Sequence, residues 1–570
     1  MEDVSVLIGG EAGDGVKRSG INLGKIFMRA GLNISVTDEY MSLIRGGHSF
    51  AIVRASSEPI FSQLSKINII VAFNKETIDK HRGELVKGGI IIYDGELALK
   101  EKDYPNLILC PIPMKRLVKE KNLPDITKNS IALGAVISLL CLDITPLKKI
   151  LKETLHSKIE ENISLAGEGY KIARNDRYCL GNLRKNKPTT SLLISGNEAL
   201  ALGAIKAGMK LYAAYPMTPA TPILHYLAQI QREADIVVLQ PESELAAMNI
   251  TVGAAYAGIR AMTGTSGGGF ALMSEALGLA AMTECPVVLV LGMRPGPSTG
   301  LATHTNQGDL RFALHASQGE FPRIVVAPGD VEECFYLTFD AFNLAEKFQV
   351  PSIIITDKYL GESYHSVPEF STKGMRIDRG KYYTVWKKKN YMRYEDAKDG
   401  VSPYVVPGTK GAVVKANSNS HDEFGYSDED GELRVRMTDR YFRKIDGIKK
   451  EIGSKALKLY GNRKARVTVL AWGSTKGPVL EALKTCEKEG INANFVQVRF
   501  LSPFPDRELG KILSSSKKVL VVENNKTSQL GSLLKEYLCF EPDSCLLRYD
   551  GRPFNPEQIS NKIKVMIRGK

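Results

Sequence analysis

Several features that would assign a sequence to a class at once are missing from this 570-residue chain. Its eight cysteines are scattered singly with no C-x-x-C pair, so neither a metal-ligand pair nor a disulfide framework is visible. The longest apolar run, 131–142, is far shorter than the ~20 residues of a membrane span. The acidic N-terminus has no signal-peptide pattern. We expect a cytoplasmic protein of about three to five domains.

The charge balance is basic. There are 76 Lys and Arg residues against 63 Asp and Glu residues, which gives a formal net charge of +13. Such an excess suits an anionic partner: a nucleotide-bearing cofactor, an acidic protein or nucleic acid. Aromatic and basic residues are interleaved at 386–394, although an acidic run follows at 422–432. A basic nucleotide- or nucleic-acid-binding protein is therefore the non-enzyme alternative.

Strand-like and helix-like stretches alternate in three blocks, a pattern typical of parallel α/β domains. A polar, basic stretch at 181–190 predicts a linker, and periodicity is lost between about Glu362 and Gly453. So long an irregular stretch is usually functional or bound to a partner. The expected boundaries are 1–180 for the first block, 191–361 for the second, 362–455 for an irregular connector and 456–570 for the third.

Two glycine-rich loops stand out in the first block. Gly9–Gly15 follows a strand-like run and precedes a helix-like one, where backbone N–H groups can bind a phosphate. Its spacing, G-G-x-x-G-x-G, departs from the dinucleotide fingerprint G-x-G-x-x-G, and a tight turn for sheet packing is the alternative. The second loop places a cation beside two glycines. The candidate cofactor-binding residues are Gly10, Gly13, Gly15, Arg45, Gly46 and Gly47.

Four loops of the second block follow expected strands directly, at 215–222, 240–244, 263–269 and 292–300. Parallel sheets bind ligands at the carboxyl ends of their strands, so the coincidence favours one active site. Helix capping by Thr218 and a helix-dipole role for the acidic residues are the structural alternatives. The candidate side chains are Tyr215, Thr218, Glu242, Glu244 and Arg294.

The segment Tyr215-Pro216-Met217-Thr218-Pro219 resembles the Y-P-I-T-P signature of the 2-oxoacid:ferredoxin oxidoreductases. These thiamine-diphosphate enzymes oxidatively decarboxylate a 2-oxoacid to its acyl-CoA. The resemblance continues through Glu242-x-Glu244, Thr265-Ser266-Gly267 and Arg294. It implies three α/β blocks in a fused gamma–alpha subunit: a Rossmann-like gamma domain, a thiamine-diphosphate pyrimidine-type domain and a transketolase C-terminal-like domain.

The resemblance also implies roles for the candidate residues. Glu244, with Glu242 as the second choice, corresponds to the carboxylate that hydrogen-bonds the aminopyrimidine ring of thiamine diphosphate. Arg294 and Thr218, with Tyr215 beside them, correspond to the groups that hold the substrate carboxylate. The two glycine loops of the first block are implied in binding coenzyme A.

The family's magnesium–diphosphate motif and its cluster cysteines are absent here, and both belong to the beta subunit of the resembled enzymes. The resemblance therefore implies a chain active only with a beta subunit that carries thiamine diphosphate, Mg and a [4Fe-4S] cluster. We expect a dimer of alpha–beta heterodimers that passes electrons to ferredoxin. The segments Ser298–Leu301 and Gln307–Leu310 resemble the 2-oxoglutarate branch, while pyruvate or a broad range of 2-oxoacids remain alternative substrates.

Overall fold

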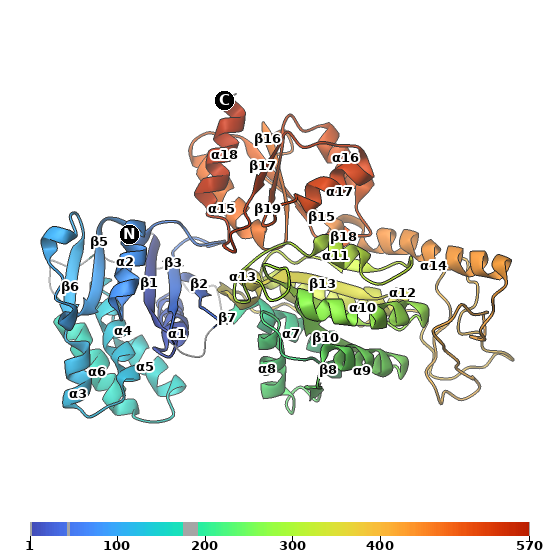
Figure 1. Ribbon diagram of the computed structural model, residues 1–570, viewed down its shortest axis with the longest axis horizontal. Coiled ribbons are helices and arrows are strands. Elements are labelled where there is room, and N and C mark those ends of the chain that lie inside the picture. Colours follow the sequence, from blue (N-terminus) through green and yellow to red (C-terminus); the bar gives the residue numbers. More distant parts are fainter. Residues whose placement is uncertain (1–2, 43–45, 175–179, 181–191, 569–570) are drawn as a thin grey trace. The chain divides into compact units, whose positions relative to one another are not determined.

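The computed structural model describes residues 3–42, 46–174, 180 and 192–568. They form two compact units (Figure 1). The first comprises residues 1–195, 363–369 and 555–558, and the second comprises residues 196–362, 370–554 and 559–570. One β-sheet lies in the first unit and two lie in the second, with helices between the strands. The predicted α/β class with three blocks is confirmed.

An eight-stranded sheet forms the first unit, in the order β6-β5-β4-β1-β3-β2-β14-β7. β1, β4, β5 and β6 are parallel, whereas the other four strands pair antiparallel. The prediction of a parallel sheet is therefore wrong for half of this sheet. The chain between β2 and β3 is too short for the crossover helix that parallel neighbours require. The strands are β1 (Asp3–Glu11), β2 (Asn33–Glu39), β3 (His48–Ser56), β4 (Ile67–Ala72), β5 (Leu85–Asp94), β6 (Ile108–Ile112), β7 (Leu192–Ser195) and β14 (Tyr364–Val367).

Helices cover both faces of this sheet (Figure 1). The larger core lies under α1, α4, α5 and α6, and the smaller core lies under α2. Successive side chains of β1 point to opposite faces of the sheet, and both faces are apolar. Val6 therefore lies in the larger core and Leu7 in the smaller one. The helices are α1 (Val16–Arg29), α2 (Lys75–His81), α3 (Met114–Glu120), α4 (Lys128–Leu139), α5 (Thr145–Thr154) and α6 (Ile159–Ile172).

Two short strands of this sheet were expected elsewhere. β7 pairs with β14, and β14 pairs with β2, all antiparallel. The sequence pattern placed β7 at the start of the second block and β14 in the irregular connector. Four-residue strands carry too little pattern to show which sheet they join. The predicted linker 181–190 lies outside the described residues.

A seven-stranded sheet organises the first half of the second unit, in the order β18-β12-β13-β11-β10-β8-β9. All its strands are parallel except β18, which pairs antiparallel with β12. The strands are β8 (Leu211–Ala213), β9 (Val237–Leu239), β10 (Ala261–Thr265), β11 (Val288–Met293), β12 (Ile324–Val326), β13 (Ser352–Asp357) and β18 (Phe500–Ser502). The helices are α7 (Gly196–Lys206), α8 (Thr221–Ile230), α9 (Glu244–Tyr256), α10 (Gly267–Met282), α11 (Leu310–His315), α12 (Val331–Phe348) and α13 (Lys358–Glu362).

A five-stranded sheet, β15-β17-β16-β19-β20, forms the third block, with only β15 antiparallel. One hydrophobic core joins it to the seven-stranded sheet, because Trp472 and Val496 pack in the same cluster as Leu289 and Ile353. The strands are β15 (Leu457–Tyr460), β16 (Val467–Trp472), β17 (Ala493–Val498), β19 (Val519–Glu523) and β20 (Ser544–Leu547). The helices are α15 (Lys476–Lys488), α16 (Asp506–Ser514), α17 (Gln529–Leu538) and α18 (Pro556–Arg568).

The connector is less irregular than predicted, because it ends in the 22-residue helix α14 (Gly431–Ile452). Asp430 caps this helix by accepting a hydrogen bond from the backbone N–H of Leu433 at 2.8 Å. Its buried face includes Met437 and Ile448 together with two cations, Arg440 and Lys444. These cations obscured the apolar stripe in the sequence.

Within the described residues, no helix combines the length and the apolar character needed to cross a membrane. No group of three His, Cys, Asp or Glu side chains there could hold a metal ion. Cys141 is disulfide-bonded, which the scattered cysteine spacing did not predict. The free cysteines include four that are buried, Cys110, Cys285, Cys334 and Cys486.

Candidate functional site

The four predicted loops of the second block meet at one edge of the seven-stranded sheet. They follow β8, β9, β10 and β11, which are parallel and lie side by side in the order β11-β10-β8-β9. The carboxyl ends of these strands therefore share one edge. The sheet order confirms that the loops leave neighbouring strand ends.

Arg294 and Thr218 contact each other across this edge. The Arg294 Nη1 atom donates a hydrogen bond to the backbone carbonyl oxygen of Thr218 at 2.8 Å. Thr218 does not cap α8, because the N-cap residue is Ala220 and no side chain caps that helix. The Thr218 hydroxyl and the remaining guanidinium nitrogens therefore form a group of donors suited to a carboxylate. Tyr215, in the same loop, is exposed.

Glu244 is buried at the first position of α9, with 4% of its surface exposed. Its Oε1 atom is buried and has no hydrogen-bond partner among the residues that the structure describes. Ser243 already caps the helix, because its Oγ accepts a hydrogen bond from the Ala246 N–H at 3.2 Å. A buried carboxylate oxygen without a partner is costly, so capping does not explain Glu244. Glu242, two residues earlier, is exposed.

The first turn of α10 packs directly against this carboxylate. A Cβ atom placed on Gly269 would lie 2.6 Å from Glu244 Oε1, so only glycine allows the close approach. Ser266, the N-cap residue of α10, has a buried hydroxyl oxygen that also lacks a hydrogen-bond partner in the described part of the chain. The edge thus presents two buried polar groups whose hydrogen bonding is incomplete.

Asp309 is a further charged residue at this edge, and it was not among the predicted site residues. A Cβ atom placed on Gly267 would lie 2.9 Å from Asp309 Oδ2, so the carboxylate rests on the first turn of α10. Burial raises the pKa of Asp309 to about 6, although the positive charge of Arg294 opposes the shift. Burial also lowers the pKa of Arg294, and Asp309 opposes that shift. Asp309 lies in the segment Gln307–Leu310, which the sequence analysis noted for its resemblance to one branch of the family. That resemblance could have added Asp309 to the candidate residues.

The first glycine loop of the other unit ends at Gly15, the N-cap residue of α1, with φ of 73°. The side chain of Asp14 folds back onto this loop, where its Oδ2 atom accepts a hydrogen bond from the Glu11 N–H at 2.8 Å. Lys128 then pairs with Asp14 at 2.8 Å. Gly13 has φ of 106° and no atom within 4 Å of the position of a Cβ. This glycine therefore faces open space on the loop.

The second glycine loop reaches the same end of the sheet. Gly46 and Gly47 have φ of 76° and 73°, and the next residue, His48, is paired with Glu11 in the β1–β3 ladder. Arg45 lies outside the described residues. His48 was not predicted; its Nε2 atom lies 2.8 Å from Nε2 of His81, and both imidazoles are buried. Burial and the neighbouring His81 lower the pKa of His48 to about 4, so His48 is neutral near pH 7.

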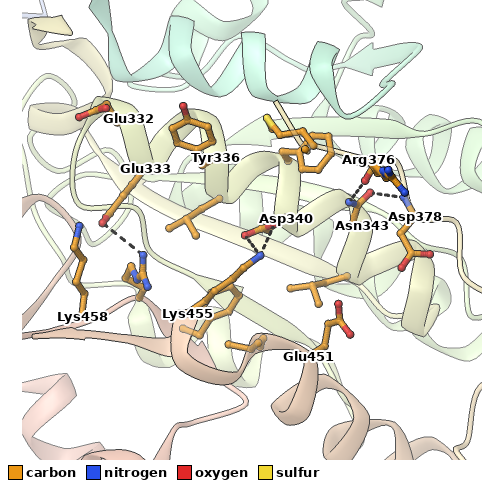
Figure 2. A pocket seen from close by; sticks show the side chains of 18 of the residues that line it. Glu332, Glu333, Tyr336, Asp340, Asn343, Arg376, Asp378, Glu451, Lys455 and Lys458 are labelled. Carbon is orange, nitrogen blue, oxygen red and sulfur yellow. Dashed lines mark hydrogen bonds and ion pairs between the residues drawn. The ribbon is translucent and has the colours of Figure 1, made fainter. Parts of the chain in front are cut away.

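A separate pocket of about 790 Å³ lies beside α12 (Figure 2), and none of the predicted site residues is in its lining. Some of its charged side chains pair with one another. Lys455 binds Asp340 at 2.9 Å, and Lys347 binds both Asp378 and Glu451 at 3.0 Å. None of the candidate residues lines this pocket, and we assign it no function.

Three family models match consecutive parts of the chain. "Pyruvate ferredoxin/flavodoxin oxidoreductase" matches residues 5–172, "Pyruvate flavodoxin/ferredoxin oxidoreductase, thiamine diP-bdg" matches 202–440, and "Pyruvate:ferredoxin oxidoreductase core domain II" matches 465–559. The chain is also 34% identical over 624 aligned residues to "2-oxoacid:ferredoxin oxidoreductase subunit alpha" of Saccharolobus solfataricus, covering 99% of this chain and 98% of that protein. The chain belongs to the 2-oxoacid:ferredoxin oxidoreductase alpha subunits.

Two further comparisons agree with this family. "2-oxoglutarate synthase subunit KorA" of Methanothermobacter thermautotrophicus is 32% identical over 388 residues, which cover 67% of this chain and all of that protein. Among solved structures, "2-oxoglutarate:ferredoxin oxidoreductase from Magnetococcus marinus with 2-oxoglutarate, coenzyme A and succinyl-CoA bound" matches with a TM-score of 0.92 and 32% identity, over 100% of both chains. The family assignment and the enzyme class predicted from the sequence are confirmed, and Thr218, Glu244 and Arg294 all lie in the thiamine-diphosphate-binding match.

Proposed function

We propose that this chain is the alpha subunit, with a fused gamma domain, of an enzyme that oxidatively decarboxylates 2-oxoglutarate to its acyl-CoA and passes the electrons to ferredoxin. The observation that carries the proposal is the edge of the seven-stranded sheet. There Glu244, whose Oε1 has no hydrogen-bond partner within the described residues, and the contacting pair Arg294 and Thr218 lie on loops at the same edge of one parallel sheet. The named relatives support the same reaction class.

Thiamine diphosphate fits this edge of the sheet. An aminopyrimidine ring offers a hydrogen-bond partner for Glu244 Oε1, the buried acceptor that has none within the described residues. When bound, thiamine diphosphate supplies the carbanion chemistry of decarboxylation. Glu244 would hold the ring and stabilise the protonation state that activates the cofactor. Glu242 is exposed and thus the weaker candidate for this role.

The substrate carboxylate would bind Arg294 and the Thr218 hydroxyl, with Tyr215 at the entrance. The hydrogen bond from Arg294 to the Thr218 carbonyl fixes one side of the guanidinium, and the other nitrogens are available for a carboxylate. A second carboxylate distinguishes 2-oxoglutarate from pyruvate. Pyruvate is the main alternative substrate.

Coenzyme A would bind the gamma domain through Gly10, Gly13 and Gly15, together with the loop that contains Arg45, Gly46 and Gly47. Both loops lie at one end of the β1–β3 ladder, and the described glycines Gly13, Gly15, Gly46 and Gly47 have positive φ. At Gly13 and Gly46 nothing lies within 4 Å of the position of a Cβ, and such open backbone suits close approach of a phosphate.

The remaining components would come from partners. We place the diphosphate-binding magnesium ion and the [4Fe-4S] cluster in a beta subunit, in a cytoplasmic dimer of alpha–beta heterodimers that reduces ferredoxin. The domain boundaries that we propose are those expected from the sequence: 1–180, 191–361 and 456–570, with the connector at 362–455.

Reconstitution tests this assignment. The chain is co-expressed with its beta subunit, and reduction of ferredoxin is followed with 2-oxoglutarate or pyruvate, with and without coenzyme A. We expect activity that requires both subunits and coenzyme A, with a higher kcat/KM for 2-oxoglutarate. A preference for pyruvate would correct the substrate, and the absence of 2-oxoacid-dependent reduction would overturn the proposal.

A further inference from the structure

Asp14 places a negative charge in the first glycine loop of the first unit. This is the loop at which we propose that the phosphates of coenzyme A bind. A carboxylate within a few ångströms of a phosphate would repel it, and the repulsion grows as solvent is excluded from the site. Either the loop binds no anion, or the charge of Asp14 is compensated by the groups around it.

Both oxygens of the Asp14 carboxylate are engaged. Oδ2 accepts a hydrogen bond from the Glu11 N–H at 2.8 Å, and Oδ1 accepts one from Lys128 Nζ at 2.8 Å. The backbone of Asp14 is held as well. Its N–H donates to the Glu11 carbonyl at 3.1 Å, and its own carbonyl oxygen accepts a hydrogen bond from Asn129 Nδ2 at 2.8 Å. Asp14 therefore closes the loop on itself and joins it to the start of α4.

Lys128 supplies the compensating charge from a buried position. Its side chain is 7% exposed, and its ammonium group also binds Asp125 at 2.6 Å. Burial lowers the pKa of Lys128, but hydrogen bonds to Asp125 and Asp14 outweigh it and raise the pKa, so the ammonium stays charged near pH 7. Without this cation the charge of Asp14 would be uncompensated, whereas Asp125, with 61% of its side chain exposed, would be screened by solvent.

The glycines of the loop divide according to these contacts. A Cβ atom on Gly10 would lie 2.6 Å from Asp14 Oδ2, and one on Gly15 would lie 2.9 Å from Asn129 Nδ2. Both glycines therefore make room for the groups that hold the loop. At Gly13, by contrast, nothing lies within 4 Å of the position of a Cβ. The loop is thus open to a ligand at Gly13, while the carboxylate of Asp14 is turned toward α4.

We propose that Asp14 is a positioning residue for coenzyme A, which fixes the glycine loop through Glu11 and α4 while Lys128 neutralises its charge. This inference rests on the proposed function. Asp14 acts through its hydrogen bonds, so an amide that keeps an acceptor oxygen can replace it. Lys128 acts through its charge, so its loss is harmful only while residue 14 is an anion.

A double-mutant cycle in the reconstituted alpha–beta complex tests the role of the charge. Lys128→Met keeps the length of the side chain but removes the ammonium, and we expect it to raise the KM for coenzyme A at least about tenfold. Adding Asp14→Asn removes the uncompensated anion and should return this KM to within about threefold of the wild-type value. The KM for 2-oxoglutarate, whose proposed site lies in the other unit, should change in neither variant.

Two variants of Asp14 alone test the positioning role without altering the buried lysine. Asp14→Asn and Asp14→Ala both lack the charge, but only the amide keeps an oxygen that can accept the Glu11 N–H bond. We expect the alanine variant to have a KM for coenzyme A at least about fivefold above that of the asparagine variant, with the same kcat at saturating coenzyme A. Lys121→Met is the control, because it removes a lysine of the same unit that pairs with Glu168 at 2.9 Å, and it should behave as the wild type.

Three results would contradict these expectations. A double variant whose KM for coenzyme A is no lower than that of Lys128→Met would make the lysine structural and overturn the inference. Equal KM values in Asp14→Ala and Asp14→Asn would also overturn it, and this comparison decides if Lys128→Met fails to assemble. Absence of 2-oxoacid-dependent turnover in the wild-type complex would instead overturn the proposed function, and the inference with it.

Discussion

Arg294 donates a hydrogen bond from Nη1 to the backbone carbonyl of Thr218 at 2.8 Å and thereby joins the loop after β11 to the loop after β8. A planar guanidinium can make this contact and still present other N–H groups to a ligand, which a lysine ammonium cannot do with the same geometry. The pair therefore fixes both the direction and the charge of the proposed carboxylate site.

Arg294→Lys should lower kcat/KM for the 2-oxoacid by about 10- to 100-fold, the range expected when a charge-assisted hydrogen bond is lost. Assembly with the beta subunit should be preserved, as measured by size-exclusion chromatography of the complex. Arg232→Lys, an exchange at an exposed position of the same unit, is the control and should leave kcat/KM unchanged. Wild-type kcat/KM in the Arg294 variant would remove this residue from the site.

Gly13→Asp tests the coenzyme A site of the first unit. Gly13 faces open space, so a side chain fits there, but its φ of 106° strains any residue other than glycine. Gly13→Ala introduces the same strain without charge and is the matched control. We expect the aspartate variant to raise the KM for coenzyme A at least about tenfold over the alanine variant, because a carboxylate would repel the phosphates. Equal KM values would make this loop a structural turn.

Glu284, which follows α10, anchors α14 to the seven-stranded-sheet part of the second unit. Its carboxylate binds Arg440 and accepts a hydrogen bond from Lys444 at 2.5 Å, and all three residues are buried. Glu284→Gln would leave two buried cations without their anion and should reduce the free energy of unfolding by about 3–5 kcal/mol. Chemical denaturation measures this change, and Glu275→Gln on the exposed face of α10 is the control. A loss below about 1 kcal/mol would show that water or other groups replace the carboxylate.

The same cluster predicts a dependence of stability on acid. Burial alone would raise the pKa of Glu284, but Arg440 and Lys444 lower it from 4.5 to about 2. Because the folded-state pKa is the lower one, the stabilisation is complete above pH 4.5 and is lost as the pH falls toward 2. Unfolding at a series of pH values should show this loss in the wild type and a smaller one in Glu284→Gln.

The sequence was most informative where pattern and local chemistry coincide. Short apolar runs followed by glycine, proline or acidic loops marked β8, β9, β10 and β11, and the same loops supplied Thr218, Glu244 and Arg294. Parallel strands end at a common edge, so these residues could be grouped before any coordinates were known. The resemblance had already favoured Glu244 over Glu242, and the structure adds that Glu244 is buried whereas Glu242 is exposed.

Other features depend on contacts that sequence pattern does not record. β7 and β14 join a sheet whose other strands are far away in the sequence, and each has only four residues. The cations Arg440 and Lys444 interrupt the apolar pattern of α14, so the sequence analysis placed this helix in the irregular connector. In the structure both cations are buried and pair with Glu284. Asp309 belongs to a resemblance noted from the sequence, but its position against Gly267 follows only from the folding of the 307–310 loop against α10.

The activation of thiamine diphosphate by Glu244 is the central claim. Glu244→Gln keeps the shape of the side chain but cannot accept the ring proton. We expect kcat to fall at least ~100-fold, the scale of a positioned proton-transfer group. The complex should still assemble and still bind thiamine diphosphate. Glu242→Gln, at the exposed carboxylate two residues earlier, is the control and should keep wild-type turnover.

The most direct measurement is proton–deuterium exchange at the thiazolium C2 of thiamine diphosphate in the reconstituted complex, followed by NMR after acid quench. It reports on cofactor activation before any substrate binds. We predict that exchange slows at least ~100-fold in Glu244→Gln and stays at the wild-type rate in Glu242→Gln. Exchange at the wild-type rate in Glu244→Gln, in a complex with thiamine diphosphate bound, would contradict the account.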